Sequence, residues 1–131
     1  MIETIASDGV VLAYIARGDS LPPQTTFLTP DDCNVQVGHG VYPAGSEIAR
    51  HIHLPLERHV VGTAEVLVIE RGHCEVDVYA QDRRRVATRE LRAGDILIAV
   101  SGGHGFRVVE DTVLLEIKQG PYPGGAEKER F

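Results

Sequence analysis

The stretch EVLVIERGHCEVDVYA, residues 65–80, decides the fold class because it joins two β-strand patterns through a glycine. In HCEVDVYA (73–80), small or apolar residues alternate strictly with His, Glu, Asp and Tyr. A period of two is typical of a strand with one buried face. In EVLVIE (65–70), both faces are apolar between the flanking glutamates, which predicts a strand covered on both sides. The Arg71-Gly72 pair between the two runs predicts a turn.

Similar short segments recur along the chain, separated by turns rich in Gly, Pro and Asp. The 14 glycines and 7 prolines are spread through all 131 residues rather than gathered in one linker. An Asp8-Gly9 pair between two β-prone runs predicts a hairpin over residues 1–20. DILIAV (95–100) is apolar on both faces, like EVLVIE, so a second layer or a dimer partner is expected behind both. Glu110-Asp111 is a further predicted turn.

The spacing of these segments predicts one all-β domain, a sandwich or a barrel. No segment is long enough for a helix of three turns. We expect a barrel core over about residues 25–119 and an extended C-terminal tail over 120–131. Besides those named above, the predicted strands cover residues 25–29, 34–42, 47–53, 85–91, 105–110 and 112–118.

Composition narrows the functional classes. A formal net charge of −6 argues against nucleic-acid binding, because phosphate recognition needs a positive surface. No apolar stretch approaches the roughly 20 residues that span a bilayer, and the N-terminus lacks a cationic segment followed by an apolar one. We therefore expect a cytoplasmic protein with no membrane partner. Cys33 and Cys74 are then most simply reduced thiols, although a single disulfide stays open.

A His-x-His pair, His51 and His53, is the first candidate for chemistry. On a strand the two imidazoles would share one face, about 6.6 Å apart along the backbone, and two imidazoles at that separation can bind one ion. Glu65 opens the next predicted strand, so an antiparallel hairpin would bring its carboxylate beside the pair, and His104 can supply a fourth donor. Three nitrogens and one carboxylate suit Fe, Mn, Ni, Co or Zn as a divalent ion. The alternative for each residue is an exposed polar side chain.

These residues resemble the motifs of the cupin superfamily, whose fold is a double-stranded β-helix, a jelly-roll barrel. Its first motif is similar to Gly45, His51-Ile52-His53, Glu65 and Gly72, except that eleven residues separate His53 from Glu65. Glu57 lies at the family's usual distance from His53 and is the second choice of ligand. The second motif resembles the segment 94–104, which keeps Gly94 and His104 and lacks the usual Pro and Asn.

The resemblance implies one divalent transition metal bound by His51, His53, Glu65 and His104, with the barrel interior as the pocket. It implies a small polar molecule as substrate in an oxygenase, isomerase or lyase reaction, with a metal-dependent oxidoreductase slightly preferred. The alternative is a cupin that binds a small ligand without turnover.

Further expectations concern the loops and the partner. Glu57 and His59, in the inserted loop, are candidates for acid–base or substrate contacts, and a solvated connection is the alternative. His39, between two glycines, can face either the cavity or water. The exposed strand edges of such a fold need protection, so a homodimer is expected.

Overall fold

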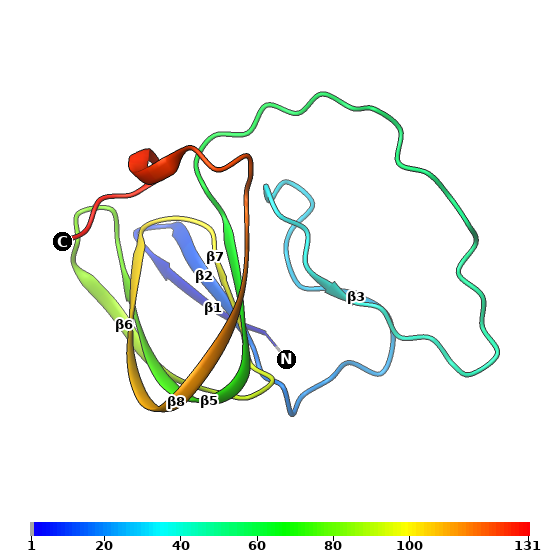
Figure 1. Ribbon diagram of the computed structural model, residues 1–131, viewed down its shortest axis with the longest axis horizontal. Helices are drawn as coiled ribbons and strands as arrows, with labels where there is room; N and C mark the ends of the chain where they lie inside the picture. The colour runs from blue at the N-terminus through cyan, green and yellow to red at the C-terminus, as the bar shows by residue number, and fades with distance from the viewer. Residues whose placement is uncertain (1) are drawn as a thin grey trace.

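One curled antiparallel sheet of six strands forms the body of the protein in the computed structural model, which describes residues 2–131 (Figure 1). The strand order is β1-β2-β7-β5-β6, and β8 also pairs with β5. The strands of this half-barrel are β1 (Ile2–Ser7), β2 (Val10–Ala16), β5 (Glu65–Tyr79), β6 (Arg85–Arg92), β7 (Ile96–Ala99) and β8 (Gly103–Lys118). The expected all-β class is confirmed.

The two longest strands, β5 and β8, are bent together along their whole length. Both continue through positions where the sequence predicted turns, Arg71-Gly72 in β5 and Glu110-Asp111 in β8, so those two turn predictions are wrong. The pairing register shifts between Ile69 and Cys74, which marks a bulged bend instead of a chain reversal. Gly72 permits this bend with a φ of 98°, a value that residues with a side chain rarely adopt.

Apolar side chains fill both faces of the central strands, as the two-sided patterns of 65–70 and 95–100 predicted. Leu67 and Leu97 belong to the main core on the concave inner face, where they are fully buried. Val66 and Ile98 are buried on the outer face, in a smaller cluster with Tyr14. Partly buried side chains of the segment after β2 cover that outer cluster, namely Leu28, Val35 and Val37.

The chain ends are tied to the sheet. The predicted Asp8-Gly9 hairpin is confirmed, since β1 and β2 pair antiparallel across it. The C-terminal tail, expected to be extended, contains a short 3-10 helix, η1 (Gly124–Glu127), and crosses one end of the half-barrel (Figure 1). Phe131 packs edge-on against Tyr79, with ring centroids 5.0 Å apart. Within residues 2–131 the structure holds no helix with the length and apolar character needed to cross a bilayer.

The segment between β2 and β5 departs most from the sequence prediction. Only β3 (Thr26–Phe27) and β4 (Gly38–His39) form there, as a separate two-stranded ribbon, so the strands predicted over 25–29 and 34–42 are shortened. The strand predicted over 47–53 is absent. Every residue from 42 to 62 is exposed, and we call this stretch the arm. Figure 1 shows the arm as a wide open loop that stands away from the half-barrel and returns to it at β5, with no neighbouring strand to pair with along the loop.

Candidate functional site

Glu65 and His104 meet at one end of the half-barrel, which we call the mouth. Their Oε2 and Nε2 atoms lie 3.0 Å apart, and the side chains are 20% and 26% exposed. Glu65 begins β5 and pairs with Ala99 at the end of β7, and His104 follows on the next strand, β8. The pairing of β5 with β7, followed by the short link from β7 to β8, brings together Glu65 and His104, which lie far apart in the sequence.

Both side chains point to the concave face of the sheet. Glu65 shares the face of Leu67, which belongs to the inner core, because alternate residues of a strand face the same side. His104 shares the face of Phe106, and the two rings meet edge-on with centroids 5.8 Å apart. The pair therefore sits at the border between the apolar interior and solvent, where an imidazole and a carboxylate can bind a polar ligand.

A lysine and the C-terminal tail complete the mouth. Lys118 lies opposite Glu65 in the β5–β8 register, and its Nζ donates a hydrogen bond to Glu127 Oε1 at 2.6 Å. The Tyr122 ring lies 5.0 Å from the same Nζ. The hydrogen bond to Glu127 raises the pKa of Lys118 above its ordinary value, and the charges of Glu127 and Glu65 act in the same direction against partial desolvation.

Sequence reasoning missed Lys118, Tyr122 and Glu127. Alternate residues of β8 share a face, so Lys118 lies on the same face as Leu114, which packs against the inner core. The alternation in the sequence was therefore enough to predict that Lys118 faces inward. The sequence of the tail has no periodic pattern that identifies Glu127. In the Lys118–Glu127 ion pair, the Glu127 side chain is nevertheless the more buried of the two, at 7% exposed.

The two histidines of the His-x-His motif lie elsewhere, on the arm. Their ring centroids are 5.3 Å apart with an interplanar angle of 76°, so His51 and His53 do form a close pair. His51 Nδ1 lies 2.8 Å from the carbonyl oxygen of Ala49. Both residues are exposed, and so are Glu57 and His59 further along the arm.

The predicted metal donors thus form two pairs rather than one cluster. The expected hairpin, which would place the Glu65 carboxylate beside His51 and His53, does not form because the arm leaves the body before β5 begins. In the described part of the chain, no three or more His, Cys, Asp or Glu residues are close enough to hold a metal ion. Three imidazoles and a carboxylate suit a divalent transition metal, but in this conformation a single chain does not bring the four side chains together.

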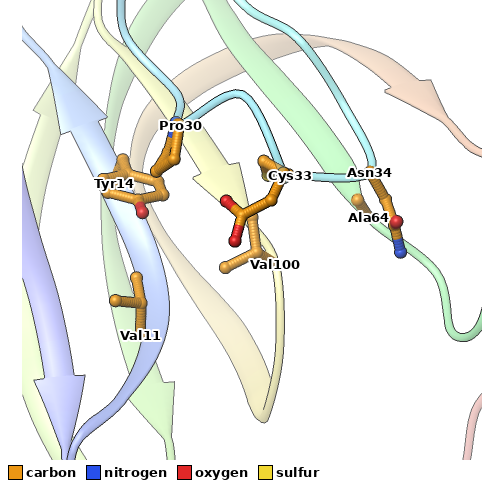
Figure 2. A pocket seen from close by; sticks show the side chains of 8 residues that line it. Val11, Tyr14, Pro30, Cys33, Asn34, Ala64 and Val100 are labelled. Carbon is orange, nitrogen blue, oxygen red and sulfur yellow. The ribbon is translucent and has the colours of Figure 1, made fainter.

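The pocket expected inside the barrel is filled by the inner core. A shallow cavity of about 400 Å³ lies instead on the outer face, between β2, β7 and the loop after β3 (Figure 2). Tyr14, Cys33 and Val100 line it, as Figure 2 shows. Burial raises the pKa of Tyr14, and the charges of Cys33 and Asp32 add to this effect.

His39 lies in β4 and is half-buried, with a buried Nδ1 atom that has no hydrogen-bond partner in residues 2–131. The structure places it in the β3–β4 ribbon, paired with Thr26, rather than at the mouth.

Comparison with known proteins gives no family for this chain. No protein-family model, no curated protein and no solved structure matches it. The functional argument therefore rests on the residues and their geometry.

Proposed function

We propose that the protein is a metal-binding cupin that acts on a small polar molecule. The observation that carries this proposal is the Glu65–His104 contact at the mouth, because two motif residues far apart in sequence meet there at 3.0 Å. His51 and His53 would supply the other two donors, and they are already paired with each other. Such a set binds Fe, Mn, Ni, Co or Zn and leaves positions open for substrate.

The double-stranded β-helix belongs to the same proposal. The half-barrel has a free edge along β8, since β8 pairs only with β5 among the described strands. The segments 34–42 and 47–53 have strand-like sequences and are almost unpaired. A closed jelly roll would result if such segments added to the edge of β8. The reaction class stays open among oxygenase, isomerase and lyase.

A cupin that binds a ligand without turnover is the second candidate. The contact favouring it is the one between Lys118, Tyr122 and Glu127, which gives the mouth a cation, a phenol and a carboxylate that need no metal. Such groups suit a sugar or a small carboxylate.

Metal analysis of the untagged protein tests the leading proposal. We expect about one transition metal ion per chain, and we expect its loss in the folded variants Glu65→Gln and His104→Ala. Glu70→Gln is the matched control, because Glu70 is an exposed carboxylate on the same strand. A native protein that takes up none of Fe, Mn, Ni, Co or Zn would leave the ligand-binding cupin as the better hypothesis.

A further inference from the structure

The cavity on the outer face contains a buried hydroxyl group that has no hydrogen-bond partner. Tyr14 lies on β2 in the small cluster with Val66 and Ile98, and it is only 8% exposed. Among residues 2–131, nothing donates a hydrogen bond to its hydroxyl or accepts one from it. Figure 2 shows the ring reaching into the cavity with its hydroxyl oxygen toward the open space. An unpaired buried hydroxyl costs free energy, so a ligand that supplies the missing bond is favoured there.

Two further polar side chains at the cavity have acceptor oxygens to offer. The Asp32 carboxylate is exposed and forms neither a hydrogen bond nor an ion pair within residues 2–131. Asn34 uses its amide N–H to donate to the carbonyl oxygen of Val61 at 3.2 Å, which leaves its Oδ1 atom available. The eight residues that line the cavity in the described chain include this one carboxylate and no Lys, Arg or His. The cavity therefore carries a negative charge that no lining residue balances.

The remaining lining of the cavity is mostly apolar. Val11 on β2 and Val100 directly after β7 contribute their side chains, together with Pro30 and Ala64. The volume of about 400 Å³ lies in the lower part of the range found for small-molecule sites. Such a cavity has room for a short hydrocarbon chain as well as a polar head group.

The loop that carries Asp32 is held in place by the side chain of Gln36. Gln36 Nε2 donates a hydrogen bond to the carbonyl oxygen of Pro30 at 2.8 Å and another to that of Cys33 at 3.1 Å. The backbone N–H of Cys33 also donates to the carbonyl oxygen of Pro30, at 3.0 Å. Because these bonds already order the loop, a ligand that binds there loses less free energy to ordering the site.

We propose that the outer cavity binds a small organic cation, which consists of an ammonium group on a short hydrocarbon chain. An ammonium group has three hydrogen-bond donors and no acceptor, so it matches the oxygens of Tyr14, Asp32 and Asn34. The hydrocarbon chain packs against the apolar lining, and the net charge of −6 attracts a cation from solution.

The same features disfavour other ligand classes. A carboxylate or phosphate ligand would lie beside the Asp32 carboxylate without a cation to offset the repulsion. A purely apolar ligand would leave the Tyr14 hydroxyl unpaired. The site lies on the outer face of the sheet, whereas Glu65 and His104 face the concave side, so it depends on no metal.

An NMR titration of the ¹⁵N-labelled protein with n-butylammonium chloride tests the proposal. We expect saturable shifts of the backbone amide signals of residues 31–34 and of Val100. 1-Butanol has the same chain without the charge and should bind about fivefold more weakly, and butyrate should not bind. Equal responses to the three probes, or no saturable change at these residues, would overturn the proposal.

Two conservative variants test the assigned contacts. Tyr14→Phe removes only the hydroxyl and Asp32→Asn only the charge, and each should raise the Kd for n-butylammonium about fivefold. Asp31→Asn is the matched control, because Asp31 is an exposed neighbour that does not line the cavity, and it should bind as the wild type does. Amide signals remote from the cavity report whether each variant is folded. Unchanged affinity in the two folded variants, or equal weakening by Asp31→Asn, would overturn the site.

Discussion

Gly72 lies directly against the backbone of Asp111, where β5 and β8 bend together. A Cβ atom at position 72 would lie 2.1 Å from the carbonyl oxygen of Asp111. The φ of Gly72 is 98°. The close approach and the backbone conformation therefore both require glycine, and together they let two long strands curve around the inner core.

The first prediction concerns this position. Gly72→Ala should lower the free energy of unfolding by about 2 kcal/mol or more, because the strand must shift to relieve the clash and the positive φ. Urea denaturation followed by circular dichroism measures the loss. Gly105→Ala is the control, since a Cβ there meets no atom within 4 Å and φ is not positive. Equal stability of the two variants would refute the argument.

Sequence patterns predicted those elements whose partners are also strands of the same sheet. The two-sided pattern of 65–70 is matched by burial of Val66 and Leu67 on opposite faces. The bend at Gly72 was predicted as a turn, because a glycine between two strand patterns looks the same whether the chain reverses or bulges. Only the pairing with β8, set by contacts far along the chain, decides between these.

The candidate site was less predictable for a related reason. The motif spacing identified Glu65 and His104, and the structure brings these two together. Alternation in 47–53 shows that the segment is able to form a strand, but it does not say which strand receives it. The predicted convergence of His51 and His53 with Glu65 assumed a hairpin that the eleven residues between His53 and Glu65 do not form.

The second prediction concerns Asp95, which joins two loops. Its carboxylate accepts hydrogen bonds from the backbone N–H of Gly18 and of Arg92, both at 2.9 Å, and from Arg17 Nη1 at 3.0 Å. Asp95 is buried, so Asp95→Ala would remove the side-chain acceptor of the Gly18 and Arg92 N–H groups and should cost about 3 kcal/mol of unfolding free energy, whereas Arg17 Nη1 keeps its hydrogen bond to the carbonyl oxygen of Glu90. Thermal or urea denaturation measures the loss. Asp19→Ala, at an exposed position in the same region, should change stability little.

The third prediction concerns the two thiols. Burial raises the pKa of the Cys74 thiol, and the charge of Asp95 adds to this. Cys74 is 1% exposed, whereas Cys33 is half-buried at the rim of the outer cavity. A maleimide should therefore label Cys33 alone in the folded protein, because thiolate and access are both needed for reaction. Mass spectrometry should show one added group in native buffer and two in denaturant. Double labelling of the native protein would contradict the buried position of Cys74.

The last prediction concerns acid stability. Arg107 and Thr88 hydrogen-bond to Asp77, and these bonds lower the pKa of its carboxyl, with the charges of Arg107 and Arg85 adding to the effect against burial. A folded pKa below the unfolded value of about 3.9 means that the ionised form stabilises the fold above that pH. This stability is lost as the pH falls through the lower, folded value.

We therefore expect the midpoint of urea unfolding to fall as the pH is lowered below about 4, and to fall less steeply in Asp77→Asn than in the wild type. The asparagine keeps the shape of the side chain and cannot titrate. Asp82→Asn is the matched control, since Asp82 is exposed on the turn before β6 and should leave the acid dependence as in the wild type. Parallel acid profiles for wild type and Asp77→Asn would show that the Arg107–Asp77 contact is not a source of pH-dependent stability.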